Sequence, residues 1–317
     1  MLSRTADHLY WMSRYTERAE NTARMLNVSY DTSMLPQAPQ AARKAWQGVL
    51  SISELIPAYA SRHGEVQREA VLHFMVRDES NSSSIASCLR AARENARAVR
   101  GALTTEAWET QNQTWLELKR LLAEGDWERD PGQFFEWVKH RSHLSRGVTL
   151  GTMLQDEAFH FLRLGTFIER ADNTARILDV KYHVLHANGN GADSGEEGAT
   201  DFYQWGALLR SLSAFEVYRK VYRDVITPER VAELLMLRSD MPRSLLASML
   251  EVVANLESVA NGQSRETQRK AGRLLADLRY ARIDEILATG LHAYLTQFLD
   301  RVHDLGQGIS RDFLVPA

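Results

Sequence analysis

A fourteen-residue segment occurs twice in this chain, at residues 17–30 and again at residues 169–182. The copies are identical at ten of fourteen positions, and three of the other four are Glu/Asp, Met/Ile and Asn/Asp exchanges. A repeat period of about 150 residues predicts a duplicated domain rather than a short-repeat solenoid. We therefore expect two repeated helical halves, residues 1–147 and 148–317, packed about a pseudo-two-fold axis as one compact unit.

The rest of the chain is typical of helices. Runs without proline and rich in Ala, Leu, Arg and Glu recur, and no segment alternates with a period of two. The pattern predicts helices at 2–32, 41–62, 65–77, 83–102, 104–124, 132–145, 148–187, 201–225, 229–237, 243–261, 265–289 and 291–313. Prolines break the pattern at Met34–Gln40, and a linker is expected from Asn188 to Thr200. The predicted fold class is all-α.

Composition narrows the function classes. The chain has 38 basic and 41 acidic residues, a net charge of −3, which gives no reason to expect wholesale attraction to nucleic acid or anionic lipid. The single cysteine, Cys88, excludes an internal disulfide framework and favours the cytoplasm. We find no apolar run of about 18 residues and no signal-peptide pattern. We expect a soluble cytoplasmic protein.

The repeated helix carries an apolar stripe beside a polar one. The apolar stripe comprises Leu9, Met12, Thr16, Ala19, Ala23 and Leu26 in the first copy, and Phe161, Leu164, Ile168, Ala171, Ala175 and Leu178 in the second. Alanine at the central positions lets another helix approach closely. We expect that helix to be the other copy of the repeat.

The polar stripe provides the candidate site. Its residues, with the arginines that follow the glutamates, are Arg14, Glu17, Arg18, Asn21 and Arg24 in the first copy, and Glu169, Arg170, Asn173 and Arg176 in the second. Two interpretations are open. Each glutamate can pair with an arginine of the other copy, which fixes the register of the helices. Alternatively, the polar groups line a central pocket whose arginines bind phosphate or carboxylate through two hydrogen bonds.

A second candidate surface is an arginine ladder. Arg90, Arg93, Arg97 and Arg100 follow at i, i+3, i+7 and i+10, on one face of a predicted helix. The positions 160 residues later are Leu250, Val253, Glu257 and Ala260. The ladder is either a solvated face with pairing within the helix, such as Arg90 to Glu94, or a surface that docks an acidic partner or binds an anion.

Catalytic and metal motifs give little support to an enzyme. Glu157 and His160 form one Glu-x-x-His, whereas di-iron bundles need two such motifs and two more glutamates. His140 and His143 lie near Glu136 without further ligands, and Cys88 is expected to be a small core residue. We find no nucleophile elbow, P-loop or dinucleotide fingerprint. We assign no catalytic residue, no metal and no cofactor.

Several motifs together resemble a known family. They are Leu2-Ser3-Arg4, Leu9-Tyr10-Trp11-Met12, Glu17-Arg18-Ala19-Glu20-Asn21, Ser87-Cys88-Leu89-Arg90 and Phe161-Leu162-Arg163-Leu164-Gly165. They resemble the bacterial alpha-E domain, named for its helices and its Glu-Arg motif, over essentially the whole chain. The chain departs from the pattern of this family at Asn81-Ser82-Ser83, where the resemblance leads us to expect a proline after the asparagine.

The resemblance implies an association with a circularly permuted ATP-grasp ligase, and often with a transglutaminase-like peptidase. It implies no catalytic residues. We therefore expect a non-catalytic binding or scaffold partner of an ATP-grasp amide ligase in a bacterial peptide-synthesis or peptide-modification system. Two alternatives stay open. One is an enzyme with a Glu/Arg-lined pocket that acts on a peptide or aminoacyl substrate, and the other is an RNA- or tRNA-binding protein that uses the arginine ladder.

Overall fold

The computed structural model describes residues 1–34, 39–188 and 204–315, and every regular element in that part of the chain is a helix. The predicted all-α class is confirmed. The linker predicted from Asn188 to Thr200 lies, apart from its first residue, outside the described residues.

The helices fall into two successive series. The first comprises α1 (Ser3–Ser33), α2 (Pro39–Ile52), α3 (Ile56–Ala60), α4 (Arg68–Val76), α5 (Ile85–Ala98), the 3-10 helix η1 (Arg100–Ala102), α6 (Thr105–Ala123), α7 (Asp126–Arg129) and α8 (Pro131–Thr152). The second comprises α9 (Glu157–Asn188), a helical segment at 204–211, α11 (Phe215–Tyr222), α12 (Pro228–Leu237), α13 (Leu245–Ser258), α14 (Arg265–Tyr280), α15 (Ile283–Thr289) and α16 (Leu291–Phe313).

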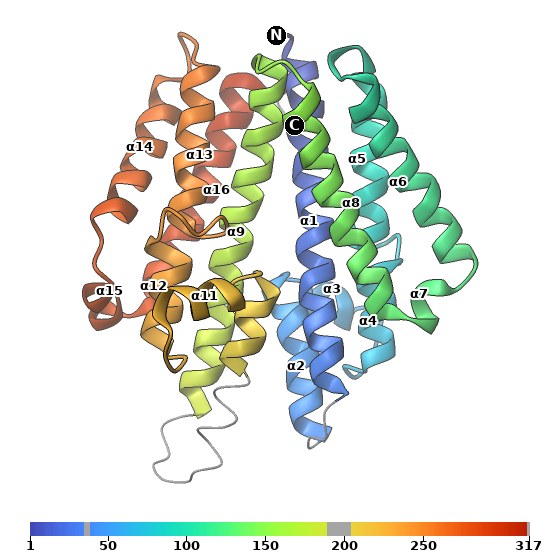
Figure 1. The fold of residues 1–317 in the computed structure, drawn as a ribbon, viewed down its shortest axis with the longest axis vertical. Helices are drawn as coiled ribbons and strands as arrows, with labels where there is room; N and C mark the ends of the chain where they lie inside the picture. The colour runs from blue at the N-terminus through green and yellow to red at the C-terminus, as the bar shows by residue number, and fades with distance from the viewer. Residues whose placement is uncertain (35–38, 189–203, 316–317) are drawn as a thin grey trace.

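The two longest helices, α1 and α9, form the middle of the bundle. They run side by side and begin at the same end, with α5, α6 and α8 on one flank and α13, α14 and α16 on the other (Figure 1). Within the first series α5 and α8 contact α1, and within the second α13 and α16 contact α9. This arrangement places the two copies of the repeated segment against each other.

Side-chain caps explain where several helices begin. Ser84 accepts a hydrogen bond from the backbone N–H of Ser87 at the start of α5, and Ser244 does the same for Ala247 at the start of α13. A serine at this position satisfies one of the N–H groups that the first turn leaves without a partner. Ser84 and Ser244 lie 160 residues apart, so the two halves of the chain share this helix cap.

The predicted helix boundary at 145–148 is wrong. Helix α8 continues through it to Thr152, and the chain leaves helical geometry only at 153–156. There the Asp156 carboxylate accepts hydrogen bonds from the backbone N–H groups of Ala158 and Phe159, at 2.9 and 3.3 Å. This cap starts α9 nine residues later than the prediction, and the proposed division at 147/148 falls inside α8.

Several other predicted helices are shorter or divided. The predicted helix at 41–62 is two helices, α2 and α3, and the one at 265–289 is α14 followed by α15. The helix predicted to reach residue 102 ends at Ala98, so Arg100 lies in η1 and not on α5. In each case apolar spacing continues across a short break that periodicity alone does not reveal.

The prediction that the apolar stripe of the first copy packs on the other copy is wrong for its alanine part, whereas Leu9 and Met12 share a cluster with residues of α9. Ala19, Ala23 and Leu26 belong to an apolar cluster made only of residues 19–138, so this part of α1 packs on its own half. Ala171 and Ala175 belong to a second cluster, which is centred on the C-terminal half and includes the beginning of α1. The polar stripe, and not the alanine stripe, faces the other copy along the middle of α1.

Helices α1 and α9 cross closely at Gly165. A Cβ atom on this glycine would lie 2.2 Å from the carbonyl oxygen of Tyr10 and 2.2 Å from Ser13 Oγ. Real Cβ atoms do not come this close to backbone atoms, so any side chain at 165 forces the helices apart. The repeat-related residue is Ser13, which lies at the same crossing on α1.

We predict that Gly165→Ala destabilises the protein, because the clash is with backbone and overpacking typically costs about 1–3 kcal/mol. The matched control is Gly306→Ala in α16, where a Cβ would meet nothing within 4 Å. That control should be neutral or stabilising by up to about 1 kcal/mol, through helix propensity alone. Urea unfolding of both variants is the measurement. Equal stability of the two would contradict the close crossing.

Candidate functional site

Two Glu-Arg dipeptides face each other across the α1–α9 seam and exchange ion pairs. Glu17 of α1 accepts two hydrogen bonds from Arg170 of α9, each 3.0 Å long. In return Glu169 of α9 accepts from Arg18 of α1, at 2.6 Å from Nε and 3.0 Å from Nη2. Both glutamates are buried, at 1% and 5% exposure. The pairing across the copies that the sequence suggested is present.

Glu17 lies at the centre of the larger of two groups of charges. Its carboxylate also accepts from Arg146 of α8, at 2.9 Å, and from Arg243, at 3.1 Å. Glu20, one turn later on α1, is fully buried and contacts Arg24, Arg146, Arg243 and the Ser142 hydroxyl. Arg243 donates to Asn21 Oδ1 at 2.9 Å as well. This group joins α1, α8, α9 and the segment before α13.

Glu169 forms the smaller group. Besides Arg18 it accepts from Arg14 Nε of α1, at 2.9 Å. The Arg14 guanidinium lies 5.0 Å from the ring centroid of Trp11, and Arg18 lies 5.7 Å from that of Tyr15. These aromatic faces add cation–π attraction to the ion pairs.

The arginines keep all three carboxylates ionised. Burial would raise the pKa of Glu169, but Arg18 and Arg14 outweigh it and lower that pKa to about 2. Burial would also raise the pKa values of Glu17 and Glu20. The charges of Arg170 and Arg243 at Glu17, and of Arg243 at Glu20, lower them, and both pKa values lie below their usual range. Burial lowers the pKa of Arg243 to about 10, so its guanidinium is still charged at neutral pH. A general base needs a pKa near the working pH, which these carboxylates do not have.

Not all of the candidate seam residues meet here. Arg24 joins the larger group, donating to Glu20 and to His143 Nε2 at 3.0 Å. Arg176 instead pairs with Asp172 and Glu54, beside a cavity of about 430 Å³ lined also by α16 residues. Within the described residues no side-chain hydrogen bond links Asn173 to either group. The second copy therefore contributes less to the seam than the first.

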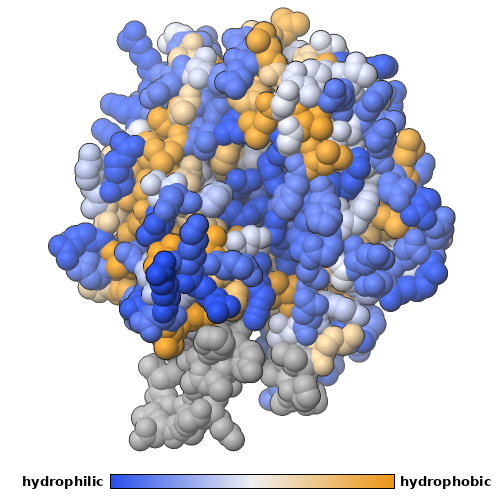
Figure 2. Space-filling view, in the orientation of Figure 1, coloured by the Kyte–Doolittle hydropathy of each residue, from blue (hydrophilic) through white to orange (hydrophobic). Residues whose placement is uncertain are grey.

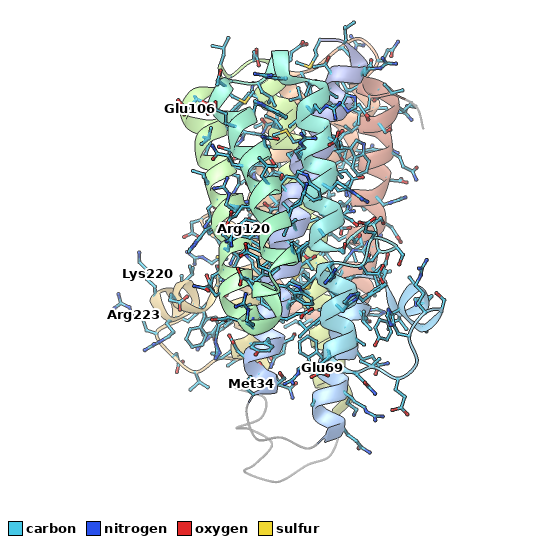
Figure 3. The ribbon with its side chains drawn as sticks, turned by 90° about the vertical axis from the view of Figure 1, so that its right-hand side faces the viewer. Met34, Glu69, Glu106, Arg120, Lys220 and Arg223 are labelled. Carbon is cyan, nitrogen blue, oxygen red and sulfur yellow. The ribbon has the colours of Figure 1, made fainter. Side chains whose placement is uncertain are left out.

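The arginine ladder is partly paired. Arg90 contacts Glu79 at 3.4 Å rather than Glu94, and Arg97 contacts Glu94 at 3.2 Å. Arg93 is half-buried, contacts Glu94 and lies 5.8 Å from the ring centroid of Trp108. Figure 3 shows this flank of the bundle, with Glu106 near the upper end of α6 and Arg120 further down. Arg97 is 65% exposed and Arg90 is 45% exposed, so these two can reach a partner.

The other candidate chemistry is accounted for by local contacts. Glu157 pairs with the amino group of Met1, and His160 bonds Asn255 at 2.8 Å. Burial raises the pKa of the Cys88 thiol to about 12, which keeps it protonated. Within the described ranges no three His, Cys, Asp or Glu side chains are grouped so that they could hold a metal ion. In the same ranges no helix is long and apolar enough to cross a membrane.

Residues 1–314 match the Alpha-E family, described as a predicted alpha-helical domain with a conserved ER motif. The chain belongs to the Alpha-E family. The resemblance read from the sequence places that Glu-Arg motif at Glu17-Arg18 and Glu169-Arg170, the two dipeptides that exchange ion pairs in the structure.

The relatives of this Alpha-E chain are longer proteins. Uncharacterized proteins of Mycobacterium bovis and of two strains of Mycobacterium tuberculosis are each 24% identical to it over 329 aligned positions. The match covers 95% of this chain but 35% of each relative, so the chain spans about a third of the length of these relatives. No solved structure matches the chain.

Three residues of the Alpha-E seam were missed by sequence reasoning about single helices. Arg146 and Arg243 come from outside the repeated segment, and Glu20 was noted only as part of a motif. One signal was available for Arg243. Arg243 lies 160 residues after Ser83, the same spacing that separates the helix caps Ser84 and Ser244. Only the second half therefore has a charge at this position.

We predict that Glu169→Gln lowers the free energy of unfolding by about 3–5 kcal/mol, because Arg14 and Arg18 lose their buried counter-charge. Glu94→Gln is the matched control. It removes a carboxylate that is 50% exposed and paired with two arginines at the surface, which should cost at most about 1 kcal/mol. Urea unfolding at pH 7 compares the two. Equal losses would contradict a buried, structural Glu169.

Acid should weaken the seam in a defined pH range. Because the pKa of Glu169 is lowered from 4.5 to about 2, its contribution is present above pH 4.5 and is lost as the pH falls toward 2. Between pH 5 and pH 3 the residue should account for about 2 kcal/mol of lost stability. Urea unfolding at both pH values should show a smaller decrease for Glu169→Gln than for the wild type. The same decrease in both would overturn this assignment.

Proposed function

We propose that this protein is a non-catalytic helical scaffold that binds an ATP-grasp amide ligase in a bacterial peptide-synthesis or peptide-modification system. The pairing of the seam glutamates with arginines supports the non-catalytic part of this proposal. Glu17, Glu20 and Glu169 are each held by at least two guanidinium groups. Carboxylates engaged in this way stabilise the packing of α1 and α9, and their lowered pKa values make them poor proton acceptors.

The choice of the ligase as the partner rests on the family resemblance. A second observation supports a binding role. The curated relatives carry nearly the whole of this chain within proteins almost three times its length. A helical unit joined to further chain in its relatives is suited to hold another domain in place. A transglutaminase-like peptidase from the same neighbourhood is a further candidate partner, and the cytoplasm is the compartment where the ligase would find ATP.

We propose that the ligase docks on two exposed members of the arginine ladder, Arg90 and Arg97. Both guanidinium groups are accessible, and their partners Glu79 and Glu94 are themselves at least half exposed. An acidic surface can replace those partners at little cost, because exposed ion pairs contribute about 0–1 kcal/mol. Complementary charge would then determine both the association rate and the choice of partner.

We also propose that the two halves of the chain, which meet at the break at 153–156 rather than at 147/148, are duplicated copies packed about a pseudo-two-fold axis. Matched contacts support this. His8 bonds Asn95 at 2.7 Å as His160 bonds Asn255 at 2.8 Å, and the first residue of each pair lies on a central helix. The reciprocal Glu-Arg exchange is the contact that such an axis would pass through.

The docking proposal predicts that Arg90→Glu/Arg97→Glu leaves the melting temperature unchanged but abolishes co-purification with the ATP-grasp ligase. The matched control is Arg269→Glu/Arg282→Glu, which reverses two arginines of similar exposure, 60% and 69%, in the other half. ATP turnover by the ligase, with and without this chain, is the second readout. Full co-purification of the double variant at low and high salt would remove the ladder from the proposal. A ligase that never co-purifies with the wild type would overturn the partnership.

A further inference from the structure

A small cavity lies beside Glu17, between α1, α8 and α9. Its volume is about 50 Å³, room for a few atoms rather than for a complete ligand, which typically needs about 300–1,000 Å³. Its polar lining comes from Glu17, Arg146, Arg163 and the hydroxyl residues Ser13, Thr16, Ser145, Thr149 and Thr166. The larger part of the wall is apolar and comes from Met12, Leu150, Leu162 and Phe167. Figure 2 shows that this face of the molecule is hollowed between α8 and α9 and that hydrophilic side chains line the hollow.

The sequence repeat explains why space remains there. One turn before Glu17, Arg14 reaches across the seam to Glu169. The repeat-related position, one turn before Glu169, is Thr166, which is too short to reach Glu17. Arg146 reaches Glu17 from α8 instead and is 25% exposed at the cavity. The cavity is thus open to solvent on one side and bounded by a guanidinium group on the other.

The charges of the group centred on Glu17 do not balance, and Arg146 is the member of its arginines that lines the cavity. On the Glu17 side four arginines, Arg24, Arg146, Arg170 and Arg243, surround only two carboxylates, those of Glu17 and Glu20. The next acids along α9 and α13 do not correct this, because Asp172 pairs with Arg176 and Glu251 with Arg163. His143 accepts from Arg24 through an unprotonated Nε2, so it is a neutral ring and supplies no counter-charge.

Hydrogen-bond donors are in excess as well. Among the described residues the amide nitrogen of Asn21 is buried and has no acceptor, while its oxygen is held by Arg243. Asn21 does not line the cavity, but excess buried positive charge also costs free energy, and an anion beside Arg146 would offset that cost. Guanidinium groups bind carboxylate and phosphate oxygens best, because both oxyanions match their planar donors.

We propose that this cavity binds a small oxyanion, a carboxylate or phosphate group, through Arg146 and the Ser145 hydroxyl. The hydroxyls of Thr149 and Thr166 donate to backbone carbonyls of their own helices and do not take part. The size of the cavity implies that it holds the charged end of a ligand whose remainder lies outside, over the hollow between α8 and α9. The proposal concerns the Glu17 side of the seam alone and does not depend on the ligase partnership.

Two variants remove the site in different ways. Arg146→Met removes the guanidinium and leaves Glu17 with Arg170 and Arg243, so the fold should persist. Thr149→Met changes no charge and places a longer side chain in the cavity. Arg97→Met is the matched control, since it removes the same charge from an exposed site on α5. If Arg146→Met does not fold, Thr149→Met decides the question.

The experiment titrates the full chain and these variants with sodium phosphate, sodium acetate and guanidinium chloride, with sodium chloride matching the ionic strength. Melting temperature and isothermal titration calorimetry are the readouts. At 100 times Kd an oxyanion should raise the melting temperature by about 4 °C. We expect this for wild type and Arg97→Met, with affinity at least tenfold weaker in Arg146→Met and Thr149→Met.

The two oxyanions distinguish the source of the ligand. A response to phosphate alone indicates a phosphorylated ligand, and a response to acetate alone indicates a carboxylate end, such as the C-terminus of a peptide. A similar shift in all four proteins would be a general salt effect and would overturn the proposal. A shift with guanidinium alone would overturn it too, because the cavity would then serve as a cation site beside Glu17.

Discussion

The exchange of ion pairs between Glu17-Arg18 and Glu169-Arg170 is the contact on which the rest of the bundle depends. Each glutamate is buried, and each accepts two hydrogen bonds from the arginine of the other copy. A charge buried without its partner is strongly destabilising, so a shift of α1 along α9 by one turn would leave four such charges. The exchange therefore fixes the register of the two central helices, and Gly165 sets how closely they pack.

Charge-paired seams of this kind contribute more to specificity than to net stability. Replacing a buried ion pair by well-packed apolar residues is often neutral or stabilising, whereas removing one partner is costly. The apolar clusters on either side provide the burial that drives folding, and each is built largely from one half of the chain. The charged layer between them determines which faces meet. The same layer has more arginines than glutamates on the Glu17 side, and the proposed oxyanion site follows from that excess.

The sequence was sufficient for what depends on local patterns. Proline-free runs predicted the helices, the fourteen-residue repeat identified the two central ones, and the polar stripe contained Glu17 and Glu169. It was insufficient where contacts join distant positions. Arg243 lies 226 residues from Glu17, and nothing in the periodicity of either helix connects them. The break at 153–156 was missed because it depends on the Asp156 cap. The orientation of Ala19 and Ala23 was misjudged because an apolar stripe does not by itself say which of two neighbouring helices it packs on.

The central claim, that Glu17 and Arg170 act as one buried pair, is tested most directly by a double-mutant cycle. The free energy of unfolding is measured for wild type, Glu17→Gln, Arg170→Gln and the double variant. Residues in one network typically show coupling of about 0.5–3 kcal/mol. We expect a coupling above 1 kcal/mol, with the double variant less destabilised than the sum of the single ones. Additive losses, within about 0.5 kcal/mol, would contradict the account.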